Sequence, residues 1–172
     1  MSRLAPLALC VALLAGCGGG GGGTVAHVNG QAIAKQRLDA LVDHFRKEAQ
    51  AEGRPFPDSG TASYDTLRNH LLGLLVYRTE LKQAADRLGV TVDKRELDRR
   101  VAAAQSGSEE GDSRDTFARD SVEAQLLTEG LFAKVTRGIA DAAARNRKWA
   151  AFQARMQKEA KVRYEPGYAP GS

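Results

Sequence analysis

The chain has 172 residues, of which 42% are hydrophobic, 6% are aromatic and 27% are charged. This length suits one domain with short appendages, and an apolar content dominated by Ala, Leu and Val favours packed helices over a sheet-rich core. The formal net charge of +4 comes from interspersed acidic and basic residues, without a basic stripe carrying aromatics, which argues against nucleic-acid binding. We therefore expect a mostly α protein.

The first sixteen residues have the features of a secretory leader. Arg3 precedes an apolar run over 4–14 that is too short to cross a bilayer. The tetrapeptide LAGC at 14–17 resembles the lipobox of bacterial lipoproteins, in which the cysteine receives a diacylglyceryl group. An ordinary leader with an incidental cysteine, or a short buried helix, is the alternative. We predict a lipoprotein signal peptide over 1–16 and lipid on Cys17, which would hold the protein on a membrane without crossing it.

The use of cysteine agrees with this prediction. Cys10 would leave with the leader and Cys17 would carry lipid, so the mature domain would have no thiol for a disulfide, a metal site or catalysis. The glycines at 18–23 could be mistaken for a phosphate-binding loop, but no strand precedes them and no Lys-Ser or Lys-Thr follows. We predict that residues 17–23 form a lipidated cysteine and a flexible tether with a mean reach of about 14 Å.

Two patterned segments follow the tether. The run TVAHV at 24–28 is β-prone and ends at the turn pair Asn29-Gly30. From about residue 34 to residue 51, apolar residues recur at helical spacing, which predicts an amphipathic helix. A loop rich in glycine and proline over 53–60 would then lead into the next helix.

The longest helical pattern runs from Tyr64 to Leu88, with apolar residues on one stripe over roughly 37 Å. Gly89 can close its last turn in the left-handed conformation. A third helix begins at once, because Asp93 can accept from a first-turn amide while Glu96 reaches back in a capping box. Such a long helix needs several other helices along it to bury its apolar stripe.

The remaining chain supplies further helices and a strand. The third helix gives way to a polar loop rich in Gly and Ser at 105–112, and helicity then resumes with a break expected near Gly138. A last helix covers 141–160 and precedes the strand-like KVRY at 161–164. Because a lone strand leaves its amides unpaired, we predict that this segment pairs with 24–28 in a small two-stranded sheet.

No residue type stands at a spacing typical of catalysis or metal binding. His27, His44 and His70 lie in different elements without ligand spacing, and no serine stands in a nucleophile motif. The acidic run at 109–112 lacks the alternation of an EF-hand loop. We therefore expect a protein that is not an enzyme and that uses no metal, cofactor or small-molecule substrate.

Two stretches carry a family resemblance. VAHVNGQAI at 25–33 is a strand ending in Val-Asn-Gly with an isoleucine beyond it, and the stretch at 71–98 combines the end of the long helix with the start of the third. Both resemble the N-terminal domain of SurA and PrsA type periplasmic and surface chaperones. The matching positions are Val28, Asn29, Gly30, Ile33, Leu75, Val76, Ala85, Gly89, Val90, Val92, Asp93, Glu96 and Leu97. The segment from Trp149 to Tyr164 is similar to the family's returning helix and strand, so the resemblance covers about 24–164.

The chain departs from that family in two places. Full members often carry a parvulin-type prolyl isomerase domain before the returning helix, whereas only residues 136–147 lie there in this chain. No isomerase site can therefore be carried over. Ala34 stands where the family tends to have a Ser or Thr that caps the first helix.

The lipobox and the family resemblance together imply an extracytoplasmic, lipid-anchored domain over 24–165, with a flexible tail over 166–172. The resemblance implies a holdase that binds unfolded or newly secreted proteins without ATP and without isomerase activity. Aromatic and methionine side chains at helical spacing are most simply core, but they are the candidates for peptide binding if grooves stay open between the helices. These candidates are Phe45, Phe117, Phe132, Trp149, Phe152 and Met156. The alternative is a scaffold lipoprotein that holds one folded envelope partner.

Overall fold

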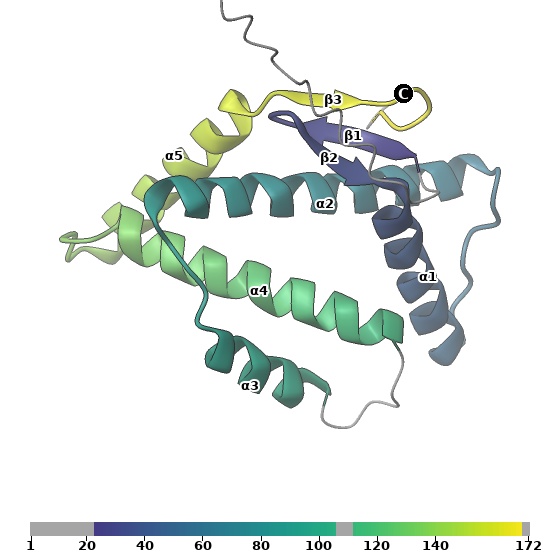
Figure 1. Cartoon of the computed structure of the whole chain (residues 1–172), viewed down its shortest axis with the longest axis horizontal. Coiled ribbons are helices and arrows are strands. Elements are labelled where there is room, and N and C mark those ends of the chain that lie inside the picture. Colours follow the sequence, from purple (N-terminus) through teal and green to yellow (C-terminus); the bar gives the residue numbers. More distant parts are fainter. Residues whose placement is uncertain (1–22, 106–111, 170–172) are drawn as a thin grey trace, which may run out of the picture.

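The computed structural model describes residues 23–105 and 112–169. Three strands and five helices make up this part of the chain (Figure 1). They are β1 (Thr24–Val28), β2 (Gln31–Ala34), α1 (Lys35–Ala51), α2 (Ala62–Leu88), α3 (Lys94–Gln105), α4 (Asp112–Val135), α5 (Ala142–Glu159) and β3 (Val162–Tyr164). The mostly α prediction is confirmed. The predicted signal peptide, Cys17 with most of its tether, and most of the polar loop at 105–112 lie outside the described residues.

The sheet joins the two ends of the fold. Its strand order is β2-β1-β3, and β1 pairs antiparallel with β3 so that Ala26 faces Tyr164 and Val28 faces Val162. This pairing confirms the predicted contact between the end segments. The prediction of only two strands was wrong, because β2 folds back along β1 before α1 begins. Ile33 alone of the four β2 residues is buried, so no alternation was long enough to predict a strand.

The start of α1 lacks a side-chain cap. Ala34 occupies the N-cap position and makes no capping hydrogen bond, because its methyl side chain has no acceptor atom. The backbone supplies a partner instead, since the amide of Lys35 donates to the carbonyl of Gly23 at 2.7 Å. One of the amides that a helix leaves free at its start is thereby satisfied.

The long helix α2 stops where the sequence predicts. Gly89 adopts the left-handed conformation, with φ 63° and ψ 36°, and closes the last turn. The helix begins two residues before the predicted Tyr64, because the hydroxyl of Thr61 accepts a hydrogen bond from the Tyr64 amide at 3.2 Å.

The start of α3 forms half of the predicted capping box. The Asp93 carboxylate accepts from the amide of Glu96 at 2.9 Å. The carboxylate of Glu96 pairs with Arg99 and Arg100 in the following turn. The oxygens of the Glu96 carboxylate therefore bond to these two arginines, whereas the capping-box prediction had one of them accept from the Asp93 amide.

The buried apolar residues form three clusters in place of one compact centre. The first fills the space between the sheet, α1 and the first half of α2. The second joins the second half of α2 to α4 and α5, and the third lies between α3 and α4. Every element from Thr24 to Tyr164 contributes side chains to these clusters, so this part of the chain has its own apolar core. The arrangement agrees with the expectation that one centre cannot bury so long a helix.

Two glycines shape the second cluster. α4 runs through Gly130 without a break, and a Cβ at this position would lie 2.6 Å from Cγ1 of Val90. The missing side chain therefore allows the link between α2 and α3 to lie against α4. Gly138 has φ 80° in the turn after α4, which confirms the predicted break. Asp141 then caps α5 by accepting from the amide of Ala144 at 2.7 Å.

Candidate functional site

A shallow pocket opens between the last turns of α2 and the second half of α5. Its volume is about 250 Å³, and its lining consists of Ala84, Arg87, Leu88, Phe152, Arg155, Met156 and Glu159. Leu88 is the one large hydrophobic residue classed as exposed in the described part of the chain, with 36% of its surface accessible. The pocket therefore has an apolar floor that solvent can reach and a charged rim.

A second hollow lies beside the first along α5. It measures about 290 Å³ and is lined by Lys148, Ala151, Phe152 and Arg155. Phe152 and Arg155 belong to both linings, so the two hollows are neighbours separated by these side chains. We call the two together the α5 groove.

A row of aromatic rings supports the wall of the α5 groove. Phe152 stacks on Trp149 with ring centroids 5.5 Å apart, and Trp149 meets Phe132 of α4 edge-on at 5.8 Å. All three rings are half-buried, while Met156 is only 5% exposed. The spacing of three and four residues places Trp149, Phe152 and Met156 on one face of α5. The row therefore fixes the position of the Phe152 ring at the groove.

Phe45 and Phe117 lie in a different place. They pack against the first cluster, with ring centroids 5.6 Å apart, and His44 stacks on Phe117 at 4.0 Å. The guanidinium of Arg78 lies 5.3 Å from the centre of the Phe117 ring. The six residues proposed from sequence thus fall into two groups, and of these six only Phe152 and Met156 line the α5 groove, while Trp149 and Phe132 lie behind Phe152.

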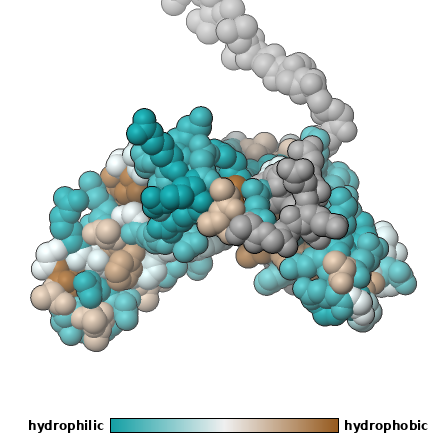
Figure 2. Space-filling model, turned by 90° about the horizontal axis from the view of Figure 1, so that it is seen from below, coloured by the Kyte–Doolittle hydropathy of each residue, from teal (hydrophilic) through white to brown (hydrophobic). Residues whose placement is uncertain are grey.

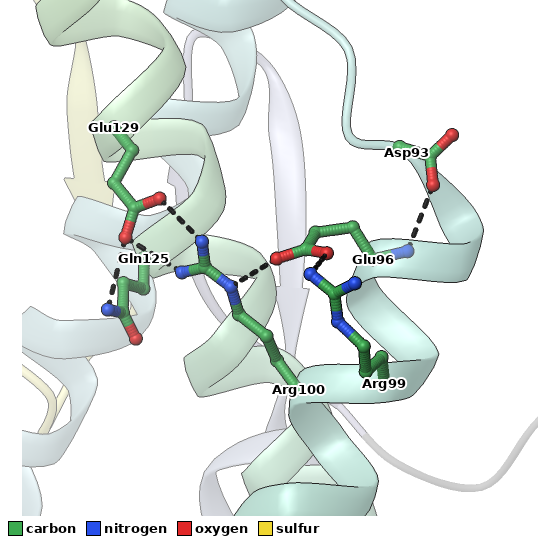
Figure 3. A network of polar contacts seen from close by, with 6 residues as sticks. All are labelled: Asp93, Glu96, Arg99, Arg100, Gln125 and Glu129. Atoms are coloured by element: carbon green, nitrogen blue, oxygen red, sulfur yellow. Dashed lines mark hydrogen bonds and ion pairs between the residues drawn. The ribbon is translucent and has the colours of Figure 1, made fainter.

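Polar contacts between α3 and α4 hold the other side of the molecule (Figure 3). Arg100 of α3 donates to both carboxylate oxygens of Glu129 on α4, at 2.8 and 3.0 Å, and to Glu96 at 2.7 Å. Gln125 also donates to Glu129, at 3.1 Å. The bond from Arg100 lowers the pKa of the Glu129 carboxyl below its usual value. These side chains satisfy one another, so we assign them a structural role.

A polar hollow of about 70 Å³ lies between α2 and α4, and its arginines also bond to other groups of the protein. Arg37 donates to Asp120 at 2.7 Å, and Arg78 donates to the hydroxyl of Ser121 at 2.9 Å. Burial lowers the pKa of the Arg78 guanidinium from its usual value. This hollow is small, and its arginines already bond to protein groups, so the α5 groove is the better candidate for a ligand.

The model of the SurA-like N-terminal domain family matches residues 4–138 of the chain. The chain belongs to this family. The matched range takes in β1 to α4 and leaves α5 and β3 outside. Chaperone SurA of Pseudoalteromonas translucida (strain TAC 125) is 27% identical over 111 residues, which make up 63% of this chain and 25% of that protein. The chain therefore aligns with about a quarter of the length of this curated relative, and the resemblance predicted from sequence is confirmed.

Side chains that could ligate a metal are dispersed in the described residues of this SurA-like domain. Within 23–105 and 112–169, no three His, Cys, Asp or Glu side chains come together as a metal site. His27, His44 and His70 lie on β1, α1 and α2 respectively. Across the same residues, no helix combines the length and the apolar character needed to cross a membrane.

The surface of the SurA-like domain is mostly hydrophilic on the face that Figure 2 shows, with separate brown patches. Several of these patches lie toward the end of the molecule that carries α5 in Figure 1. On this face, exposed apolar surface is therefore limited and divided into small areas. A ligand would contact one or two side-chain-sized depressions rather than a wide apolar cradle.

Sequence reasoning missed part of the α5 groove. It placed Leu88 on the buried stripe of α2, and it described the charged residues as interspersed without singling out Arg87, Lys148 or Arg155. Leu88 is exposed because it stands in the last turn, just before the chain leaves α2 at Gly89. A count of charge by segment would have drawn attention to the basic residues, since α5 is far more basic than the rest of the chain.

Proposed function

We propose that this SurA-like domain is a membrane-anchored extracytoplasmic lipoprotein that binds unfolded or newly secreted polypeptides as an ATP-independent holdase chaperone. Lipid on Cys17 would hold it at the cell membrane, with residues 17–23 as the tether. The family to which the chain belongs, and the chaperone name of its relative, support a chaperone role.

The observation that carries the proposal is the apolar floor of the α5 groove. Leu88, Phe152 and Met156 meet there between two helices, and Leu88 is open to solvent. A depression of about 250 Å³ is below the usual size of a drug-like ligand site and suits one large side chain of an extended polypeptide. Flexible apolar side chains also tolerate different sequences, as a holdase requires.

The proposal includes the absence of prolyl isomerase activity. Six residues, 136–141, connect α4 to α5 in this chain, at the place where full members of the resembling family often carry an isomerase domain. A proline-containing peptide assay should give cis to trans conversion at the uncatalysed rate, whereas acceleration that depends on the protein would contradict this part of the proposal.

The holdase proposal is tested with the chain from residue 17 onward, carrying Cys17→Ser so that it is handled without lipid. A denatured envelope protein is diluted from urea, without ATP, and its aggregation is followed by light scattering. The SurA-like domain at several-fold excess should slow the rise in scattering, and Phe152→Asp should slow it much less. Scattering that rises equally with and without the domain would refute the proposed activity.

Lipid attachment is tested separately in cells. The wild-type chain should be recovered with the membrane fraction, and its N-terminal peptide should have the mass of a lipidated Cys17. The Cys17→Ser variant should move to the soluble fraction. Recovery of both forms in the soluble fraction would refute the anchor without affecting the holdase proposal.

The second candidate is a scaffold lipoprotein that holds one folded envelope partner. The small amount of exposed apolar surface favours it, because a broad holdase usually needs more. Capture from envelope extract separates the two functions. A holdase should retain many proteins weakly and lose them when they fold, whereas a scaffold should retain one partner tightly in its folded form.

A further inference from the structure

The net positive charge of the chain is concentrated on one segment. Residues 142–164, which contain α5 and β3, hold seven basic residues and one acidic residue. The rest of the chain has two more acidic than basic residues. The basic residues are Arg145, Arg147, Lys148, Arg155, Lys158, Lys161 and Arg163, and the acidic residue is Glu159. The α5 groove therefore lies on the basic part of an otherwise slightly acidic molecule.

The basic side chains at the α5 groove are available for a partner. Elsewhere, bridges between elements such as Arg37 with Asp120 and Arg119 with Asp98 neutralise arginines. Among the residues that the structure describes, Arg87, Lys148 and Arg155 take part in no such bridge, and all three are exposed. Their charges are thus not compensated by a contacting carboxylate of the fold.

The same side chains flank the apolar floor. Lys148, Phe152 and Arg155 follow one another at steps of four and three residues, so they share one side of α5. Arg87 precedes Leu88 in the last turn of α2 and lines the opposite edge. An apolar side chain held over Phe152 would therefore have positive charge on both sides, opposed only by Glu159 within the lining.

We propose that the α5 groove selects polypeptide segments in which an apolar side chain is flanked by acidic residues. This inference rests on the proposed holdase function and defines its preferred clients. Carboxylates beside the anchoring side chain would reach Arg87, Lys148 and Arg155, whereas lysines at the same places would be repelled. Exposed ion pairs are individually weak, so we expect about tenfold preference from two or three of them at low salt and little at high salt.

An anionic lipid surface is the competing partner for a basic helix. The geometry favours a polypeptide, because the basic groups surround two side-chain-sized depressions and not a flat face. A bilayer can contact the outer residues of α5 but cannot fill the space between α2 and α5. Vesicle binding is therefore included as an outcome of the test.

The test uses three fluorescent, unstructured peptides with the same central Leu and Phe residues. Their flanking residues are Glu in one, Ser in the second and Lys in the third. Binding to the Cys17→Ser chain from residue 17 is measured by anisotropy at low salt and at high salt, about 0.5 M, where exposed charges are largely screened. We expect the Glu peptide to bind about tenfold more tightly than the Ser peptide at low salt, and the Lys peptide to bind least.

Two triple variants isolate the cause of any preference. Arg87→Gln with Lys148→Gln and Arg155→Gln should equalise the affinities for the Glu and Ser peptides. Lys94→Gln with Arg95→Gln and Arg137→Gln removes the same charge from exposed positions outside the groove lining. This control variant should keep most of the preference.

The outcomes separate the inference from the proposed function. Equal binding of all three peptides to the wild-type chain would overturn the charge preference and leave the holdase proposal standing. Binding of none would overturn both. Equal peptide binding together with strong binding to phosphatidylglycerol vesicles, lost in the groove variant, would overturn the preference and assign the basic groups to a lipid surface.

Discussion

Asn29 and Lys161 lie 132 residues apart and join the two ends of the fold through two hydrogen bonds. The Asn29 amide donates to the Lys161 carbonyl at 2.9 Å, and the Lys161 amide donates to Oδ1 of Asn29 at 2.8 Å. The side-chain amide of Asn29 also donates to Gln83 of α2 at 2.7 Å. Its backbone has φ 51°, a conformation that asparagine tolerates better than most residues. One residue thus serves the hairpin turn, the start of β3 and the contact with α2.

Asn29→Ala should lower the free energy of unfolding by about 1–3 kcal/mol, because alanine loses both side-chain hydrogen bonds and is strained at positive φ. Asn29→Asp keeps an oxygen for the Lys161 amide and should lose less. Urea unfolding measures both variants. Wild-type stability in Asn29→Ala would mean that this junction does not hold the ends of the fold together.

Gly130→Ala should destabilise the fold although alanine favours helices. The added Cβ would lie 2.6 Å from Cγ1 of Val90, a side chain whose β-branch leaves it little freedom to turn away. Gly73→Ala in α2 is the matched control, since nothing lies within 4 Å of its Cβ position. That control should gain up to about 1 kcal/mol from helix propensity.

The Gly130 prediction has a rescue. In a protein that already carries Val90→Ala, adding Gly130→Ala should lower the free energy of unfolding much less than it does in the wild type. Thermal or urea unfolding of the four proteins gives the coupling. Equal effects of Gly130→Ala in both backgrounds would show that the contact with Val90 does not require glycine.

Glu80 should make stability depend on pH. It is 6% exposed on α2, and burial raises the pKa of its carboxyl above the usual 4.5. The folded protein therefore holds this proton more readily than the unfolded chain, so stability falls as pH rises from the unfolded pKa through the folded one. Glu80→Gln cannot ionise at this position and therefore avoids that loss. The difference in free energy of unfolding between Glu80→Gln and wild type should therefore favour the variant more at pH 7 than at pH 4.

Urea unfolding at the two pH values tests the Glu80 prediction. Asp58→Asn in the exposed loop before α2 controls for the removal of one negative charge. A stability difference between Glu80→Gln and wild type that is the same at pH 4 and pH 7 would contradict the proposed effect of burial on Glu80.

Arg100 should contribute to the attachment of α3 in a salt-dependent manner. Arg100→Ala removes the bidentate bond to Glu129, so the melting temperature should fall at low salt and fall less at about 1 M salt. The pKa of Glu129 is lowered in the fold, so its contribution is present above the usual carboxyl pKa and is lost as pH falls through the lowered one. The effect of Arg100→Ala should shrink accordingly in acid.

Arg99→Ala is the matched control for Arg100. Arg99 pairs with Glu96 inside α3, so its removal breaks no salt bridge between helices. Calorimetry should show the smaller loss for this variant. Equal losses for the two variants would indicate that the link from Arg100 to Glu129 adds nothing to the attachment of α3.

Local rules explain which parts of the fold were predictable. Gly89 ends α2 and Asp93 begins α3 through backbone geometry that the sequence alone specifies. The contact between β1 and β3 followed from the need of a lone strand for a partner. The two helix ends depend on a residue type and its immediate neighbours, and the strand pairing depends on a general requirement of backbone amides.

Features that depend on three-dimensional placement were not predictable in the same way. β2 was missed because only Ile33 marks it, and the close contact of Gly130 with Val90 joins segments forty residues apart. Sequence spacing grouped Phe117 with Phe152 as candidates, but they lie on different clusters, because the start of α4 packs on the first cluster whereas the second half of α4 and α5 pack on the second. The α5 groove likewise depends on where α5 crosses α2.

The most direct measurement of the proposed client binding is site-specific cross-linking to an unfolded polypeptide. In the Cys17→Ser chain from residue 17, which has no other cysteine, Ala151→Cys is labelled with benzophenone beside the α5 groove, and Ala102→Cys is labelled on exposed α3 as the control. With a denatured envelope protein, binding at the α5 groove predicts a strong cross-link from position 151, little from position 102, and loss of the former in Phe152→Asp. Equal cross-linking from both positions would contradict client binding at the α5 groove. The absence of a cross-link from position 151 while aggregation is still suppressed would contradict it as well.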